Sequence, residues 1–556
     1  MRHAVFCLAT FLVGVLLVAP VPHVAANPDY VSFLNYLDTT RAMGMINDLA
    51  GDQFEGRRAG THGADLASEY IGSNFKAMGL QPAGTDGTYR TGFTMPLWEL
   101  AEIPSIELMD PLGNTLQNLV YRKDFTVIPG SGGGDDSAEV VFGGYGTTVP
   151  SLGYDDYSGI SVRGKIILAM VGSPASDQFT QDDYAPAYVK AENALSHGAV
   201  GLILVDSPAD PTPNYMKRQR CGCCWTFYQG LTILGGSVDL ADILLEGSGV
   251  TLKSLQRTID ETMEPKSFPL GKQLHMHVQV QFTTHANAYN VLGFIPGSDP
   301  SASEKAVIIG AHYDHWGKDV DGSIFRGAND DASGVAVMME IARLFSAGAI
   351  PKLSVLFAAW SGEEEGFYGA YAYVSHPYFS LRGTLAYLNL DMVGYGERLL
   401  AEVSEAHEAL RAITSESAGE LGISILLGGY SGGSDHSQFE ERGVPNLMFI
   451  YWPDEVYHTP GDTTDHVSKA NLLGTARLTA LVALRLSEAI ILPITSSTAT
   501  SHEVSSPTIL PVTSAVVIVG IAFLVVATVG VLHVKRYEKR RNYIGTSMKS
   551  FSRSSL

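Results

Sequence analysis

AVIIGAHYDH, residues 306–315, is the stretch that decides the fold class of this 556-residue chain. Its first five residues form an uninterrupted apolar run, which predicts a buried strand. The run ends in polar side chains that can bind a metal ion. Because alternate residues of an extended segment point the same way, His312 and Asp314 share a face, where a carboxylate can fix the tautomer of a ligating imidazole. The pattern therefore predicts an α/β fold with a candidate metal ligand at a strand end; a hydrogen-bonded structural histidine is the alternative.

Two adjacent aspartates lie in the middle of the next segment, GANDDASG at 327–334. This segment leads into apolar residues at helical spacing. Carboxylates before a helix commonly cap it, because they accept hydrogen bonds from its unpaired N–H groups. Asp331 fits that capping role. Asp330 stands in a glycine-flanked loop, where the backbone can approach a metal closely, so we interpret it as a candidate bridging ligand.

Three successive glutamates follow the third apolar run, which spans 353–360 and continues as SGEEEG at 361–366. Neighbouring carboxylates repel one another, so such a cluster after a hydrophobic strand is costly unless it is exposed or a cation is present. A solvated acidic turn is one interpretation. The other assigns one carboxylate to a metal ion and its neighbour to proton transfer.

Two further strands deliver polar residues in the same way. The strand at 387–390 precedes Asp391, and the strand at 446–451 is soon followed by YHTPGDT at 457–463, which contains His458. Two histidines and three carboxylates are a ligand set suited to paired zinc ions. In open α/β sheets, sites form beyond the carboxyl ends of the strands, which is where all five residues fall.

The composition excludes several classes of protein. With 45% hydrophobic and 17% charged residues, the chain is mostly globular rather than disordered. Its 37 Lys and Arg are outnumbered by 58 Asp and Glu, for a net charge of -21, which argues against a nucleic-acid partner. Four cysteines exclude a scaffold built on disulfides.

The two ends predict a membrane-anchored protein. Residues 1–26 combine an early Arg, a short apolar run and small residues at a cleavage site, which is typical of a signal peptide. A Ser/Thr-rich stalk is expected at 493–510, a transmembrane helix at 511–534 and a basic tail at 535–556. Positive charge favours the cytoplasmic side, so we expect a single-pass cell-membrane protein whose N-terminal ectodomain lies outside and whose tail lies in the cytoplasm.

Taken in order, HYD, GANDDASG, GEEEG, NLDMVG, SDH and YHTPGDT closely resemble the co-catalytic zinc aminopeptidase family of secreted bacterial leucyl aminopeptidases and glutamate carboxypeptidase. The resemblance is tight over residues 306–463 and looser at FEGR, residues 54–57. It implies a catalytic domain with a central mixed sheet flanked by helices, and two zinc ions per chain. The metal ligands that it implies are His312 and Asp391 for one zinc, Glu364 and His458 for the other, and Asp330 between them.

The resemblance also implies catalytic roles. Glu363 falls on the position of the general base that activates a zinc-bound water, and Asp314 on that of a residue supporting His312. Tyr430 lies near a tyrosine that steadies the tetrahedral intermediate in some relatives, although its spacing to the SDH motif is one residue longer here. We interpret Asp435 and His436, within that motif, as packing or supporting residues.

The resemblance divides the ectodomain into a split catalytic domain, 27–97 and 286–492, around a β-rich insertion at 98–285. Motifs such as VVFGGYG at 140–146 and HGAVGLILV at 197–205 are similar to a protease-associated domain, which implies a roof over the cleft or selection of substrates by size. The insertion holds Cys221, Cys223 and Cys224. One disulfide plus a free or intermolecular thiol is expected, with undecided connectivity.

The leading hypothesis is therefore an extracellular zinc exopeptidase that removes N-terminal residues from peptides. A carboxypeptidase or dipeptidase would use the same metal core and differ only in its pockets. Glutaminyl cyclase is disfavoured by the Glu363-Glu364 pair and the insertion, and a non-catalytic receptor by the presence of all five ligands. Side-chain specificity and oligomeric state are left open by the sequence.

Overall fold

The computed structural model describes residues 28–489, except for 111, 177, 180–185, 207, 209–226 and 349–350. The expected leader, stalk, membrane helix and tail lie outside these residues, as do all four cysteines. None of the helices that are described is both long and apolar enough to span a bilayer.

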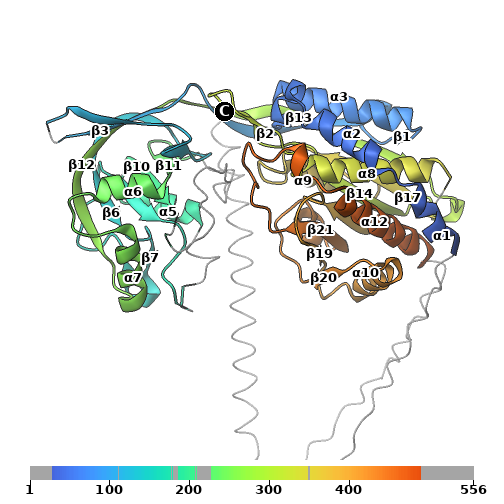
Figure 1. Cartoon of the computed structure of the whole chain (residues 1–556). Helices are drawn as coiled ribbons and strands as arrows, with labels where there is room; N and C mark the ends of the chain where they lie inside the picture. Colours follow the sequence, from blue (N-terminus) through green and yellow to red (C-terminus); the bar gives the residue numbers. More distant parts are fainter. Residues whose placement is uncertain are drawn as a thin grey trace, which may run out of the picture. The chain divides into compact units, whose positions relative to one another are not determined.

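A nine-stranded mixed sheet forms the framework of the predicted catalytic domain (Figure 1). Its order is β1-β13-β17-β14-β18-β21-β19-β20, with β2 paired to β13. The central strands β17, β14, β18 and β21 are parallel, whereas β13 and β19 run antiparallel to their neighbours β17 and β21. The prediction of a mixed sheet is confirmed. The strands are β1 (Gln81–Pro82), β2 (Arg90–Leu100), β13 (Val280–Ile295), β14 (Ala306–His312), β17 (Ser354–Trp360), β18 (Thr384–Leu390), β19 (Arg398–Glu402), β20 (Ile425–Gly428) and β21 (Asn446–Trp452).

Helices flank this sheet on both faces, as expected (Figure 1). One face packs against α2, α3, α8, α10 and α12, and the other against α9 and α11. The helices are α1 (Pro28–Phe33), α2 (Thr39–Leu49), α3 (His62–Ala77), α8 (Ala332–Ser346), α9 (Tyr368–Ser375), α10 (Glu408–Leu421), α11 (His436–Glu440) and α12 (Lys469–Ala489).

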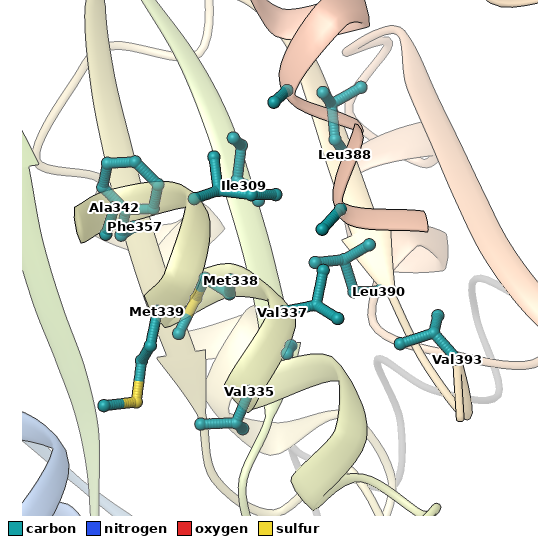
Figure 2. Packing of buried hydrophobic residues seen from close by; sticks show 14 of the residues in the cluster. Ile309, Val335, Val337, Met338, Met339, Ala342, Phe357, Leu388, Leu390 and Val393 are labelled. Atoms are coloured by element: carbon teal, nitrogen blue, oxygen red, sulfur yellow. The ribbon is translucent and has the colours of Figure 1, made fainter. Parts of the chain in front are cut away.

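Strand β14 is buried along its whole length, as its apolar run predicts. Val307 and Ile309 join the core under α8, while Ile308 joins the core on the opposite face, because successive side chains alternate across a strand. Figure 2 shows Ile309 and Phe357 packed against α8 residues. Fully burying such a side chain contributes about 1.5–3 kcal/mol. This apolar packing holds the polar residues that follow each strand.

An eight-stranded sheet in the order β4-β3-β12-β6-β9-β10-β11-β5 forms the second framework. It lies between Ser105 and Val278, within the predicted insertion 98–285, whose boundaries stay a prediction. Long strands β2 and β13 pair with each other where the chain enters and leaves this region, with Leu100 opposite Val280. The strands are β3 (Ser105–Met109), β4 (Thr115–Leu119), β5 (Phe125–Val127), β6 (Gly134–Gly143), β9 (Ile166–Met170), β10 (Gly201–Val205), β11 (Thr232–Gly236) and β12 (Ser267–Val278).

Shorter elements complete the described chain. Two small hairpins are β7 (Thr148–Val149) with β8 (Tyr154–Asp155), and β15 (Gly317–Lys318) with β16 (Ile324–Phe325). The helices beside the second sheet are α5 (Ala187–Ser196), α6 (Val238–Leu245) and α7 (Leu252–Thr262). The 3₁₀ turns are η1 (Leu34–Tyr36), η2 (Asp52–Arg57), η3 (Thr85–Gly87), η4 (Pro150–Leu152), η5 (Pro300–Ala302) and η6 (Thr464–His466).

Candidate metal centre

Three neighbouring parallel strands bring the predicted site residues to one edge of the mixed sheet. Strand β14 ends at His312, β17 ends shortly before Glu363 and Glu364, and β18 ends directly before Asp391. Because β17, β14 and β18 are adjacent and parallel, their carboxyl ends lie side by side. The strand pattern thus predicts correctly where these polar side chains gather.

The first group of ligand atoms contains His312, Asp330 and Asp391, all buried. His312 Nε2 lies 3.2 Å from Asp330 Oδ1 and 3.5 Å from Asp391 Oδ1. On the other side of the ring, Nδ1–H donates to the main-chain carbonyl oxygen of Asp314 at 3.1 Å. That hydrogen bond sets the tautomer, so Nε2 is the nitrogen that can accept a metal.

The second group contains His315, Asp330 and Glu364, also buried. His315 Nδ1 lies 2.8 Å from Glu364 Oε1 and 3.7 Å from Asp330 Oδ2. His458 reaches the same carboxylates through Nε2, at 3.1 Å from Asp330 Oδ2 and 3.2 Å from Glu364 Oε2. Asp330 therefore faces the two groups with its two different oxygens, an arrangement suited to a bridging ligand.

The three glutamates have three different environments. Glu364 faces the histidines, and Glu363 Oε2 lies 3.9 Å from His312 Nε2. Glu365 instead forms a buried ion pair with Arg58, whose Nε lies 2.8 Å from Glu365 Oε1. All three side chains are buried, which excludes the interpretation as a solvated acidic turn. Because Glu365 pairs with Arg58, Glu363 and Glu364 are the two glutamates that face the metal-ligand groups.

The carboxylate of Asp314 supports the glutamate loop more directly than it supports His312. It accepts hydrogen bonds from the main-chain N–H groups of Glu363 at 3.2 Å and Glu364 at 3.3 Å. Its Oδ1 lies 3.8 Å from His312 Nδ1, beyond hydrogen-bond range, and the imidazole uses the Asp314 carbonyl instead. Asp314 thus joins the two strand ends through both its side chain and its backbone.

Asp331 occupies the capping position that the sequence predicts. Its Oδ1 accepts hydrogen bonds from the N–H of Gly334, in the first turn of α8, and from the N–H of Met392. The peptide bond between Asp330 and Asp331 is cis. One aspartate therefore anchors the helix to the loop after β18, while its neighbour faces the histidines.

Sequence reasoning missed several residues around the site. His315 belongs to the quoted HYDH motif, but it lies beyond the end of β14, where strand alternation no longer predicts direction. Asp462 accepts hydrogen bonds from the N–H groups of Asn329 and Asp330, and Asn329 Oδ1 accepts from the N–H of Gly394. These residues stand inside quoted motifs, and only the fold assigns their contacts.

The buried carboxylates and imidazoles of the site shift one another's pKa values. Burial alone would lower the pKa of His458, but the carboxylates of Glu364 and Asp330 outweigh it and raise the pKa to about 9. At His312, burial is likewise outweighed by carboxylates, Glu363 foremost, which hold its pKa well above the ordinary value. Burial and Glu364 would raise the pKa of Asp330, but the neighbouring histidines lower it to about 2. A bound cation would take the place of the protons on these imidazoles.

The predicted residues after β20 differ in their surroundings: burial and the nearby Glu363 raise the pKa of Asp435, whereas Tyr430 is partly exposed. Tyr430 is 39% exposed, and its ring lies edge-on to that of His436 with the centroids 5.3 Å apart. Burial raises the pKa of Tyr430 to about 12, so its hydroxyl is protonated at neutral pH. Asp435 and His436 are fully buried, which agrees with a packing or supporting role. The contacts described for Tyr430 join it to His436 rather than to the two ligand groups.

The donor set fits a pair of divalent cations. Within the described part of the chain, Asp330 Oδ2 is buried and makes no hydrogen bond, although His458 Nε2 lies 3.1 Å away. Burying such atoms is costly unless they are paired or coordinate a metal. Imidazole nitrogens together with carboxylate oxygens are the ligands that zinc accepts in proteins.

The model of peptidase family M28 matches residues 290–483, which include every predicted metal ligand. This part of the chain is similar to peptidase family M28. The resemblance to co-catalytic zinc peptidases is thereby confirmed at the level of the family.

Curated relatives are similar to the chain over part of their lengths. The chain is 27% identical to aminopeptidase YwaD of Bacillus subtilis (strain 168) over 350 residues, covering 59% of this chain and 64% of YwaD. It is 28% identical to aminopeptidase NAALADL1 of Mus musculus over 277 residues, covering 42% of this chain and 36% of that protein. With the vacuolar membrane protease of Candida dubliniensis, identity is 31% over 208 residues, 36% of this chain and 21% of that one. The chain thus spans less than two thirds of these relatives.

Solved structures share this fold. An aminopeptidase from Aneurinibacillus sp. strain AM-1 matches with a TM-score of 0.60 and 22% identity, covering 82% of this chain and 96% of that one. BSAP, a zinc aminopeptidase from Bacillus subtilis, matches with a TM-score of 0.56 and 20% identity, covering 81% and 95%. At these identities the likeness establishes the fold.

Proposed function

We propose that the chain is a zinc-dependent exopeptidase that removes N-terminal residues from peptides and is anchored to the cell membrane with its catalytic part outside. The observation that carries the enzymatic part is Asp330, whose two oxygens face two separate groups of buried ligands. The M28 match and the aminopeptidases among the relatives support the same activity. The anchor and its orientation rest on the sequence of 511–556 alone.

In this proposal His312 and Asp391 would hold one zinc, Glu364 and His458 would hold the other, and Asp330 would supply an oxygen to each. We choose His458 rather than His315 for the second zinc because His458 Nε2 lies almost equally far from Asp330 and Glu364, at 3.1 and 3.2 Å. His458 Nε2 is therefore placed to bind an ion held by the carboxylates of Asp330 and Glu364. His315 Nδ1–H donates to Glu364 instead, and it holds that carboxylate in place.

Bound zinc would supply Lewis-acid chemistry by lowering the pKa of a coordinated water and polarising the scissile carbonyl. Glu363 is positioned to accept a proton from the attacking water, because its carboxylate lies beside the first group without being one of its members. It would then return that proton to the leaving amine. Tyr430 is proposed to steady the developing negative charge, and this requires its exposed loop to approach the site.

The experiment that tests this function uses the purified full-length chain and one peptide in three forms: unmodified, N-acetylated and C-terminally amidated. We expect cleavage of the unmodified and amidated forms, no cleavage of the acetylated form, loss of activity with a chelator and recovery with zinc. Cleavage that survives chelation, or that is absent after zinc is restored, contradicts the proposal. Activity lost on amidation but kept on acetylation would instead identify a carboxypeptidase.

A further inference from the structure

Arg57 contacts both ends of the hairpin that separates candidate ligands. Strands β15 and β16 lie between His315 and Asp330, so this hairpin connects one candidate ligand loop to the next. Arg57 belongs to the FEGR motif in η2, and its side chain is completely buried. The proposed chemistry gives this motif no role.

All four side-chain hydrogen bonds of Arg57 go to main-chain carbonyl oxygens. Nε donates to Tyr313 at 2.6 Å, before the hairpin, and Nη2 donates to Gly327 at 2.8 Å, after it. Nη1 donates to Arg326 at 2.7 Å and to Leu49 at 2.5 Å, at the end of α2. One planar guanidinium therefore fixes the distance between the two ligand loops and ties both to a helix.

The backbone beside Arg57 is shaped for this contact. Glu55, Gly56 and Arg57 have φ angles of 49°, 69° and 54°, so three successive residues adopt the left-handed conformation. A Cβ at Gly56 would lie 2.3 Å from the carbonyl oxygen of Phe325 and 2.7 Å from that of Gly317. Only glycine lets the chain approach both strands of the hairpin so closely. The cost of this conformation indicates that the surrounding contacts enforce it.

The charge of Arg57 also suits its surroundings. Burial lowers its pKa to about 10, opposed by Asp462, Asp314, Asp330 and Asp331, so the guanidinium stays charged at neutral pH. It offsets part of the negative charge of the ligand loops without occupying a ligand position. Main-chain carbonyls fill its donors, which leaves the carboxylates facing the candidate metal positions.

We infer that Arg57 is a positioning residue of the metal centre: by holding Tyr313, Arg326 and Gly327 it sets the spacing of the candidate ligands on either side of hairpin β15–β16. The inference rests on the proposed metal function and adds a residue that never touches substrate or metal. A lysine keeps the charge but cannot supply the planar set of four hydrogen bonds.

The test compares Arg57→Lys and Arg57→Met with wild type and with the control Arg326→Met, all as full-length chains. Arg326 is a suitable control because its partly exposed side chain pairs with Asp52, while only its carbonyl contacts Arg57. Zinc affinity is measured by competition with a chromophoric chelator, and metal geometry by the absorption spectrum of the Co²⁺-loaded protein. Steady-state kinetics at saturating zinc separate kcat from KM.

We expect Arg57→Met to weaken zinc binding about 10- to 100-fold, with a changed Co²⁺ spectrum and a lower kcat at similar KM. Arg57→Lys should be intermediate and Arg326→Met unchanged. Wild-type affinity and spectrum in both Arg57 variants would overturn the inference, even if their melting temperatures fall. If the Arg57→Met protein does not fold and accumulate in cells, the zinc affinity and Co²⁺ spectrum of Arg57→Lys test the inference.

Different results would contradict the proposed peptidase activity and the proposed role of Arg57. A wild-type chain that binds two zinc ions but cleaves no peptide contradicts the proposed activity, and the affinity comparison still decides the role of Arg57. A wild-type chain that binds no zinc overturns both.

Discussion

Two buried clusters of charged groups in the described part of the chain differ in how their charges find partners. In the second sheet region, Lys190 and Asp156 form a small cluster in which each charged group finds its partners. Lys190 Nζ donates to the carbonyl oxygens of Tyr145 and Gly172. Asp156 accepts hydrogen bonds from the N–H groups of Tyr145 and Thr147, each at 3.0 Å. The Lys190 amine and the Asp156 carboxyl group thus both have hydrogen-bond partners within the chain.

The candidate metal centre contains more carboxylates than the chain can match. The carboxylates of Asp330, Glu363, Glu364 and Asp391 lie around the imidazoles of His312 and His458, whose pKa values they hold above the ordinary value. Among the described residues, Asp330 Oδ2 is left without a hydrogen bond, whereas no atom of Lys190 or Asp156 is. We infer that a buried charge cluster whose groups find their partners within the chain is structural, while one that needs an external cation is a candidate metal site.

Removing metal should have the largest effect, because only the carboxylate-rich cluster depends on it. We expect chelation to reduce peptidase activity to background and to lower the free energy of unfolding by about 4 kcal/mol relative to zinc at a thousand times its Kd. The measurements are activity and chemical unfolding before chelation, after it and after zinc is restored. If activity and stability are unchanged in chelator, the carboxylate-rich cluster does not depend on a metal ion, and this prediction is wrong.

Glu363→Gln should separate chemistry from metal binding. The amide cannot accept the proton of the attacking water, so kcat should fall about 10²- to 10⁴-fold while two zinc ions remain bound. Metal content by atomic emission and steady-state kinetics check this. The matched control is Glu365→Gln, which weakens the ion pair with Arg58 and should cost less activity. An unchanged rate in Glu363→Gln would assign the base elsewhere.

Lys190→Met should affect stability and leave chemistry intact. Asp156 would lose its buried cation, and the free energy of unfolding should fall by about 3 kcal/mol, with kcat/KM and zinc content unchanged. Denaturant unfolding at constant zinc measures the loss. Lys165→Met, which removes the more exposed pair with Glu139, is the control and should change stability little. Lost zinc in Lys190→Met would refute the independence of the two clusters.

Zinc affinity should rise with pH by at most about tenfold per unit for each proton displaced. Without metal, the pKa of His458 is raised to about 9, above its ordinary 6.5, so the ring carries a proton between these values that zinc must displace. The affinity should therefore increase as pH approaches 9 and level off above it. Calorimetry in buffers of different ionisation enthalpy counts the released protons. A pH-independent affinity with no proton release would show that these histidines are not ligands.

Much of the site could be predicted because the sequence places ligands directly after apolar strands. His312 ends β14 and Asp391 directly follows β18, and the apolar packing that aligns parallel strands also aligns their ends. Asp331 was predicted as a helix cap from its place before α8, and its bond to Gly334 confirms this. Strand ends and caps are local signals, so sequence patterns reveal them.

Other features could not be predicted, because they join distant segments through directional contacts. Glu365, rather than Glu363 or Glu364, pairs with Arg58 across 307 residues of sequence. His315 turns toward Glu364 only because the chain leaves the strand after β14. Periodicity carries no information about such partners.

The apolar strands, the polar residues at their ends, the helix cap and the excess of carboxylates can all be read from the sequence, since each follows from local pattern or composition. Which glutamate pairs with an arginine, that Asp330 faces two groups, and that Arg57 binds carbonyls 256 and 270 residues away are visible only in the folded chain. The two kinds of feature differ in the sequence distance over which the interactions act. Burial and capping act on neighbours along the chain, whereas ion pairing and ligand geometry depend on which strand ends the fold brings together.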